Sequence, residues 1–189
     1  MNHNRQAKLS GQQGEYSVSY VLSQLPSNFY IINNLLLKTP RGSTQIDHVV
    51  VSPYGVFVIE TKNHKGYIFG DCYSKYWMQV LHKKCGICKY QFYSPYQQNM
   101  SHMMHLVKYY DIPCDCIQGL IVFSNINADL SYINCPAFNT IGLYNYLINQ
   151  RCQILSNNTM MNIIYTLENS NISNKRNDRK HIKYVNSFR

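Results

Sequence analysis

The stretch "TQIDHVVVSPYGVFVIETKNHKG", residues 44–66, reads as two apolar strands joined by a tight turn. Asp47 lies in the first strand, and Glu60 and Lys62 lie in the second. Because an isolated charge is costly to bury, charged residues inside such apolar runs usually have a partner or a function. The stretch therefore predicts both a central hairpin and a candidate site within it.

The register of this hairpin follows from its turn. If the turn "SPYG" is symmetric, Asp47 lies opposite Glu60 and Gln45 lies opposite Lys62. Side chains alternate between the two faces of a strand, so these four residues share one face. The same face carries four valines, Val49, Val51, Val56 and Val58.

Two carboxylates opposed across a hairpin have Cβ atoms roughly 5 Å apart and repel unless a proton or a cation lies between them. Oxygen ligands of this kind suit Mg²⁺ or Mn²⁺. Lys62, on the same face, could orient or help deprotonate a water, or stabilise charge on a phosphate. The layout predicts phosphodiester cleavage, and the alternative is a surface salt-bridge cluster at the strand ends.

Length and composition limit the rest of the interpretation. A chain of 189 residues with 45% hydrophobic content can bury one ordinary core, so we expect one domain with at most an appendage. No run of about 20 apolar residues and no apolar N-terminal block are present, which predicts a cytoplasmic protein without a membrane span. Seven cysteines without framework-like spacing fit a reducing compartment and free thiols.

The formal net charge of +9 favours a polyanionic partner, since 18 Lys and Arg oppose 9 Asp and Glu. Residues 174–189 hold six Lys or Arg and one Asp, so +5 of the excess lies in this segment. Such a run is most often a solvated end, and a phosphate-binding arm is the alternative. We predict that residues 170–189 form a basic, flexible tail.

The apolar pattern predicts the order α, β, β, β, short strands, α, β. Val18, Val21 and Leu22, for example, recur at helical spacing near the N-terminus. The expected helices are 9–25, 94–110, 142–150 and 157–168. The expected strands are 29–37, the two arms of the hairpin, short strands at 66–70 and 75–81, and a buried strand at 117–124. This order predicts an α/β fold.

The helix at 94–110 has a defined start, with Ser94 as N-cap and Pro95 in the first helical position. One continuous apolar face is expected to pack on the sheet. That face comprises Tyr96, Met100, Met103, Val107 and Tyr110. Gln98 falls on the opposite side with His102 and His105, a polar strip that either faces nucleic acid or is simply solvated.

Four separate segments of the chain resemble a known family. The run "IDHVVVSPYGVFVIETKNHKGYIFG" (46–70), with "GQQGE" (11–15) before it and "SPYQQN" (94–99) and "GLIVFS" (119–124) after it, closely resembles the nuclease-related domain (NERD) family. The resemblance implies membership of the PD-(D/E)xK nuclease-like superfamily. It also implies a restriction-endonuclease-like core, α-β-β-β-α-β, with a mixed central sheet flanked by helices.

Carried over residue by residue, the resemblance implies catalytic and metal-binding roles. Asp47 and Glu60 match the metal-binding acids, and Lys62 matches the catalytic lysine. The backbone carbonyl of Thr61 would be a further metal ligand. Glu15 matches an acid of the first helix, and its place at the edge of the buried helix face agrees with that role. The alternative for Glu15 is a helix-end carboxylate favoured by the macrodipole.

Further residues are predicted to contact substrate. Gln98 matches the family's glutamine, with Gln97 as the alternative, and Gln45 shares the face of the two acids. Lys83 and Lys84 precede an aromatic run and are suited to phosphate contact beside base stacking. A packed hairpin with its lysines in water is the plainer alternative for this segment.

Cys85 and Cys88 look like half of a zinc knuckle, which residues of the 102–116 segment could complete. The spacing fits no familiar zinc module. Incidental thiols are therefore the main interpretation, and a structural metal is the open alternative.

The sequence thus predicts a nuclease-like domain at 11–124, a helical and strand extension at 125–169 packed on the same domain, and the tail. The predicted function is Mg²⁺- or Mn²⁺-dependent hydrolysis of phosphodiester bonds, with DNA as partner, in DNA processing. Fold and motif do not establish turnover. The alternatives are a non-catalytic nucleic-acid-binding module and a partner-binding module that retains the fold.

Overall fold

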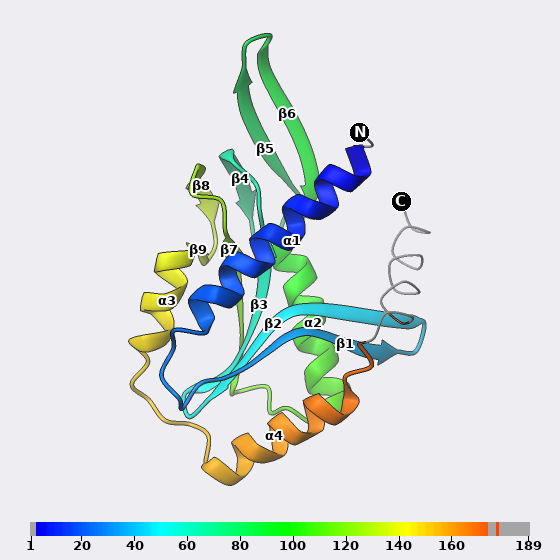
Figure 1. The fold of residues 1–189 in the computed structure, drawn as a ribbon, viewed down its shortest axis with the longest axis vertical. Coiled ribbons are helices and arrows are strands. Elements are labelled where there is room, and N and C mark those ends of the chain that lie inside the picture. The colour runs from blue at the N-terminus through cyan, green and yellow to red at the C-terminus, as the bar shows by residue number, and fades with distance from the viewer. Residues whose placement is uncertain (1–2, 174–176, 178–189) are drawn as a thin grey trace.

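The hairpin at residues 42–62 forms the centre of the fold, in a computed structural model that describes residues 3–173 and 177 (Figure 1). Its arms pair in the predicted register, with Val51 opposite Val56 and Val49 opposite Val58. The elements in chain order are α1 His3–Leu22, β1 Tyr30–Thr39, β2 Gly42–Ser52, β3 Gly55–Lys62, β4 Gly66–Asp71, β5 Tyr76–Lys83, β6 Gly86–Tyr93, α2 Pro95–Tyr110, β7 Ile117–Phe123, β8 Ala128–Asn134, β9 Ala137–Asn139, α3 Thr140–Ile148 and α4 Asn157–Ser170.

Five strands form the central sheet, in the order β1-β2-β3-β7-β9. Strands β1, β2 and β3 pair antiparallel, whereas β7 and β9 join in parallel. A parallel partner needs a long crossover, and the chain between β3 and β7 supplies one that contains α2. The order α1, β1, β2, β3, α2, β7 confirms the predicted restriction-endonuclease-like α/β core with its mixed sheet.

A second sheet arises largely from the segment between β3 and α2. Its order is β6-β5-β4-β8, with β4 and β8 parallel and the other pairs antiparallel. The short strands predicted at 66–70 and 75–81 correspond to β4 and β5. The sequence pattern does not predict β6, because most of its side chains are exposed and give little apolar periodicity. The β5–β6 hairpin extends beyond the rest of the fold (Figure 1).

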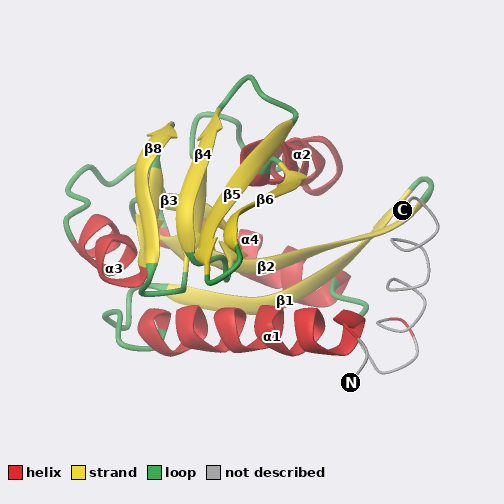
Figure 2. Ribbon diagram, turned by 90° about the horizontal axis from the view of Figure 1, so that it is seen from above, coloured by secondary structure: helices red, strands yellow, loops and turns green. Residues whose placement is uncertain are grey.

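Helices cover both faces of the central sheet (Figure 2). Helices α1 and α3 pack on the face that carries Val50, Phe57 and Ile59, and α2 and α4 pack on the face that carries Val49 and Val58. Every residue of β3 before its last is buried, as expected for a strand covered on both faces. The end of β3 is therefore fixed by all of the surrounding layers.

Helix α1 differs from the predicted helix at both ends, since it begins at His3, six residues before the predicted start at residue 9. Helix α1 ends at Leu22, before the predicted end at residue 25, because the chain tightens into a turn in which Gln24 N donates to Val21 O at 3.2 Å. Helix α2 begins as predicted, with Ser94 Oγ accepting from Gln97 N at 3.3 Å. No helix of the described residues is long and apolar enough to cross a bilayer.

The C-terminal part of the chain packs on the central sheet through α3 and α4. Helix α4 buries Ile163, Ile164 and Leu167 against β1 and β2, and Tyr30 Oη donates to Glu168 Oε1 at 2.5 Å. Of the predicted basic tail at 170–189, residues 174–176 and 178–189 lie outside the described residues.

Gly14 lets α1 approach the end of the central sheet closely. A Cβ at this position would lie 2.6 Å from Ser124 Oγ and 2.9 Å from the Cβ of Asn63. Gly11 on the same helix differs, because a Cβ there would have no neighbour within 4 Å. Substitutions of the two glycines can therefore be compared to distinguish the effect of close packing on stability from the effect of helix propensity.

We predict that Gly14→Ala lowers the free energy of unfolding by about 1–3 kcal/mol, because the added methyl group overpacks this contact. Gly11→Ala should instead raise it by about 0.5–1 kcal/mol, since alanine has the higher helix propensity. Urea unfolding followed by circular dichroism measures both changes. A stabilised Gly14→Ala variant would contradict the close packing of α1.

His48 is a buried imidazole on the face of β2 that α1 covers. Its Nδ1 lies 2.7 Å from Asn33 Oδ1, and its Nε2 has no hydrogen-bond partner among the described residues. Burial lowers the pKa of His48 from 6.5 to about 4. The fold favours the neutral ring, so this contribution to stability is complete above pH 6.5 and is lost as the pH falls toward 4. Burial lowers the pKa of His64 to about 4 as well, so this histidine also reduces stability as the pH falls.

We predict that stability decreases as the pH falls from 6.5 to 4, because the unfolded chain takes up protons that the native histidines exclude. His48→Gln should reduce the slope by up to about 1.4 kcal/mol per pH unit. Denaturant unfolding across this pH range tests the expectation, and equal slopes for His48→Gln and the parent would disprove it.

Candidate active site

The carboxyl end of β3 brings three functional groups to one edge of the central sheet. Strands β3 and β7 run parallel, with Lys62 in register with Phe123, so both strands end at this edge. In open α/β sheets, ligand sites lie at the carboxyl ends of the strands. Glu60, Thr61 and Lys62 occupy this position.

Asp47 reaches this edge through its side chain. The ladder between β2 and β3 stops one residue before Asp47, so the predicted strand pair of Asp47 with Glu60 is not formed. Instead, Thr61 N donates to Asp47 Oδ2 at 2.8 Å. The carboxylate thus takes the place of the next backbone acceptor of the ladder, and the two acids still meet at the end of β3.

The predicted pairing of Gln45 with Lys62 fails because β2 parts from β3. Strand β2 continues with β1 as a two-stranded ribbon that leaves the central sheet (Figure 1). Gln45 lies opposite Leu36 in this ribbon, and its Nε2 donates to Asn34 Oδ1 at 3.1 Å. Asn34 has a positive φ of 54°, a local distortion beside the point of departure.

Lys62 connects Glu60 to α2. Its Nζ donates to Glu60 Oε1 at 2.5 Å and to Gln98 Oε1 at 3.1 Å. Gln97 turns away and donates to Cys72 O at 2.8 Å, so Gln98 is the glutamine of this group. Glu60 is 1% exposed, whereas the Lys62 side chain keeps 20% of its surface exposed. A surface salt-bridge cluster therefore does not describe Glu60, and Lys62 is the more exposed partner of the pair.

Helix α2 presents polar side chains to the central sheet, which the sequence pattern does not predict. His102 Nε2 lies 3.4 Å from Glu60 Oε2, a charged contact when the imidazole is protonated. Asn99 Nδ2 donates to backbone carbonyls of β3 and β7, at 2.9 Å and 3.1 Å, and so bridges these strands. The sequence holds one signal that could have predicted this burial, because Asn99 and His102 align with Leu106 at helical spacing. The more apolar face that contains the methionines obscures it.

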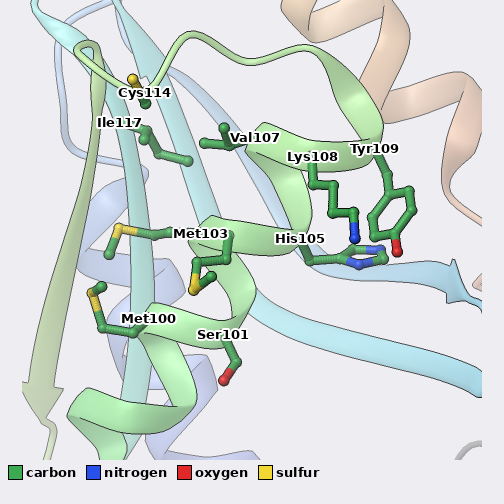
Figure 3. A pocket seen from close by; sticks show the side chains of 10 residues that line it. Met100, Ser101, Met103, His105, Val107, Lys108, Tyr109, Cys114 and Ile117 are labelled. Atoms are coloured by element: carbon green, nitrogen blue, oxygen red, sulfur yellow. The ribbon is translucent and has the colours of Figure 1, made fainter.

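The predicted apolar face of α2 lies at the margin of the helix–sheet contact. The residues of α2 that are buried are Pro95, Asn99, His102 and Leu106. The helix takes this orientation because its two buried polar residues find partners inside, while methionine tolerates partial exposure. An open pocket of about 650 Å³ remains beside the methionines (Figure 3). Its lining includes Met100, Met103, Val107, Cys114 and Ile117, and none of the acids.

The two acids at the end of β3 carry opposite pKa shifts. Burial raises the pKa of Asp47 well above its ordinary value, and the charge of Glu60 adds to this effect. Burial would also raise the pKa of Glu60, but Lys62, aided by His102, holds it below the ordinary value. Burial opposes the charge on Lys62, yet Glu60 and Asp47 raise its pKa above the ordinary value. At neutral pH the Lys62–Glu60 pair is therefore charged, and the charge of Lys62 offsets only part of the effect of burial on Asp47.

Glu15 joins this acidic group from α1. The close approach of α1 at Gly14 brings the next residue toward the end of β3. Burial raises the pKa of the half-buried Glu15, and the charge of Glu60 adds to the shift. Glu15 lies well inside α1, so the alternative of a helix-end carboxylate is wrong.

The oxygen donors at the end of β3 fit a hard cation that keeps several water molecules of its hydration shell. Glu60 Oε2 is buried without a hydrogen-bond partner. One carboxylate oxygen of Asp47, Oδ2, accepts a hydrogen bond from Thr61 N. Within residues 3–173 and 177, no three His, Cys, Asp or Glu side chains converge to hold a metal by themselves. This donor set suits Mg²⁺, which is commonly bound by one or two carboxylates and completes its shell with water and phosphate.

Lys83 and Lys84 lie apart from the acidic group, at the end of the β5–β6 hairpin (Figure 1). Lys83 Nζ donates to Tyr90 Oη at 2.6 Å and lies 5.0 Å from the centre of that ring. Cys85 and Cys88 belong to the same hairpin, and no described residue completes a metal site with them. The fold therefore separates the predicted phosphate-contacting lysines from the predicted catalytic residues.

Comparisons of sequence identify relatives of this chain. The family model of the nuclease-related domain matches residues 10–124. An uncharacterized protein of Bacillus anthracis is 32% identical over 188 residues, which cover 95% of this chain and 85% of that protein. No solved structure gives a significant match.

We predict that the two acids affect stability in opposite directions when metal is absent. Asp47→Asn should raise the free energy of unfolding at neutral pH, on the order of 1 kcal/mol, because it removes a carboxylate that the fold prefers protonated. This gain should vanish as the pH falls below the ordinary Asp value of 3.8, where the parent is also neutral. Glu60→Gln should lower it, on the order of 1–3 kcal/mol, because Lys62 loses its partner.

Urea unfolding in EDTA, at neutral and at acidic pH, measures both effects. Asp115→Asn, an exposed substitution away from the site, is the control and should stay within about 0.5 kcal/mol of the parent. If both acid substitutions change stability in the same direction at neutral pH, the assignment of charges to this group is wrong.

Proposed function

This chain belongs to the nuclease-related domain family, and on that premise we propose that it is a metal-dependent nuclease that hydrolyses phosphodiester bonds of DNA. That family is placed in the PD-(D/E)xK nuclease-like superfamily. The observation that carries the proposal is the buried Glu60 at the carboxyl end of β3, paired with Lys62 and coupled to Asp47. The buried Glu60, the partly buried acids Asp47 and Glu15 and the partly exposed Lys62 form an arrangement that a phosphate substrate and a cation would complete.

Asp47 and Glu60, with the backbone carbonyl of Thr61, would hold Mg²⁺ or Mn²⁺. When bound, the ion would neutralise the two acids and polarise the scissile phosphate and the attacking water. The structural support for this role is Glu60 Oε2, which has no hydrogen bond and only the 3.4 Å contact with His102 Nε2, and the raised pKa of Asp47.

Lys62 would stabilise the charge that develops on the phosphate. Two of its three N–H groups donate to Glu60 and Gln98, which leaves one for a phosphate oxygen. Its raised pKa keeps the ammonium charged, so its contribution is electrostatic and it does not act as a base. Gln98 would be a positioning residue that holds the ammonium in place.

Glu15 is the acid best placed to receive the proton of the attacking water. In hydrolysis the water oxygen bonds to phosphorus, the bond from phosphorus to the leaving sugar oxygen breaks, and the water gives up a proton. Burial raises the pKa of Glu15, which brings a carboxylate closer to the value that a general base needs near neutral pH. Gln45 would contact the substrate from the β1–β2 ribbon.

The charge of the chain agrees with nucleic acid as the partner, since the formal net charge is +9. We propose DNA processing in the cytoplasm as the setting, where the seven cysteines would stay reduced. Lys83 and Lys84 would contact the phosphate backbone at a distance from the cleaved bond.

We predict that Asp47→Asn and Glu60→Gln abolish cleavage and weaken metal binding, because each removes a proposed ligand. Lys62→Ala should retain metal affinity or increase it, since Glu60 Oε1 becomes free, while the rate falls roughly 100- to 1,000-fold. Isothermal calorimetry with Mg²⁺ and Mn²⁺ measures binding. Cleavage is measured on circular and linear DNA with each metal.

Lys108→Ala, at an exposed position of α2, is the control for the loss of one positive charge and should bind metal and cut at close to the parent rate. If the three site variants bind metal and cut like the parent, the site is wrongly assigned. If the parent binds DNA but cuts neither substrate with either metal, the chain is the non-catalytic binding module.

A further inference from the structure

Among the described residues, no helix packs on the outer face of the second sheet, which presents large side chains to solvent. Helices α1 to α4 pack on the strands of the central sheet. Among the side chains on the uncovered face, Tyr67 and Phe69 each keep 38% of their surface exposed, and Tyr132 keeps 52%. Single exposed aromatics are ordinary, but a contiguous group of them marks an interaction surface.

Strand register shows that these rings share one face. Residues directly opposite in neighbouring strands point to the same side, and Phe69 lies opposite both Met78 on β5 and Tyr132 on β8. A register shift between β4 and β8 keeps Tyr132 on this side next to Tyr67. The alternate residue of β4, Ile68, is fully buried on the opposite side.

The rings form a continuous array across the strands. Phe69 and Tyr132 stack with ring centres 4.6 Å apart. Tyr67 lies edge-on to Tyr132 at 6.0 Å and to His82 at 5.5 Å. Toward the other end of the face, Tyr76 and Tyr93 are paired at 6.2 Å. Mutual packing fixes the rings in position and still leaves much of their surface open.

The charge around this face favours an anionic partner. Residues 65–93 and 128–134 contain five Lys and two Asp, and no Arg or Glu. Lys89 lies opposite Val80 and therefore on the same face as the rings. Asp129, opposite Tyr67, and Asp71, two residues after Phe69, also lie on the face of the rings. Asp71 accepts hydrogen bonds from Tyr73 N and Ser74 N and Asp129 accepts one from Ser131 N, and five Lys against these two Asp leave the second sheet with a net charge of +3. On such a surface the rings can stack with nucleic-acid bases, and the lysines can pair with phosphates.

We propose that this face, defined by Tyr67, Phe69 and Tyr132 with Lys89, binds single-stranded nucleic acid by stacking unpaired bases on its rings. Only unpaired bases offer a free face, because the bases of a duplex stack on each other. The substrate class rests on the proposed function, and strand β4, which carries two of the rings, begins four residues after Lys62 in the chain.

A second copy of the chain is the competing occupant, because exposed aromatic faces also form dimers. The lysine excess argues against it, since two copies would bring like charges together. Tyr132→Ala distinguishes the two possibilities. It should weaken oligonucleotide binding if the face binds nucleic acid, and it should weaken self-association if the face binds a second copy.

The test is a fluorescence anisotropy titration in EDTA, with a labelled single strand of about 20 nucleotides, longer than the ~4–16 nucleotides that one stacking module covers, and the matching duplex. Tyr132→Ala and Phe69→Ala should each weaken single-strand binding roughly five- to a hundredfold. Duplex binding should change little. The slope of log affinity against log salt should stay the same, because no phosphate contact is lost.

Three controls isolate stacking from folding and charge. Tyr132→Phe keeps the ring and should bind like the parent. Tyr165→Ala removes a more exposed tyrosine from α4, 72% against 52% for Tyr132, and should also bind like the parent. Lys89→Ala should reduce the salt slope by about 0.7, since it removes one phosphate contact to a single strand.

Two results would overturn the proposal: single-strand binding by the ring variants at the parent affinity, or equal losses for single strand and duplex. Loss of a dimer in size-exclusion chromatography without loss of nucleic-acid binding would assign the face to a second copy and overturn it as well. The assay needs no cleavage. If the parent cuts no DNA while the ring variants lose binding, the binding face stands and the nuclease proposal fails.

Discussion

The burial of Glu60 at the end of β3 is the constraint on which the rest of the site depends. β3 is covered on both faces, so the glutamate at its carboxyl end has no access to bulk water and must be compensated by its neighbours. Lys62 supplies the counter-charge through a direct hydrogen bond. The same ammonium is tied to α2 through Gln98. One buried carboxylate thus sets the charge of the lysine and the position of the adjacent helix.

The orientation of α2 follows from this constraint. The helix places His102 against Glu60 and uses Asn99 to bridge carbonyls of β3 and β7, so its buried side is partly polar. Hydrogen bonds satisfied in a low-dielectric interior specify an arrangement more strongly than apolar contact does. The methionines are turned to the margin as a result, and an open pocket lies beside them.

The fold places the proposed catalytic residues and the proposed binding surface on different sheets. The acids and Lys62 lie at the edge of the central sheet, whereas the exposed rings and lysines lie on the inserted second sheet. The segment from Asn63 to Lys65 links the two. Site residues on a rigid central strand are positioned precisely, and a surface on an inserted sheet can vary without disturbing them. Such a division agrees with the proposed action on a long polymer.

The sequence alone determined the order of the core elements, the register of the hairpin near its turn and the position of Glu60 and Lys62 at the end of one strand, because strand alternation and turn chemistry are local. Tertiary structure decided three other matters. The departure of β2 toward β1 ended the ladder before Asp47, which left Gln45 away from Lys62. Buried partners for Asn99 and His102 outweighed the apolar stripe of α2. The second sheet put rings from β4 and β8 on one face, since strand neighbours distant in sequence are set by packing and not by local pattern.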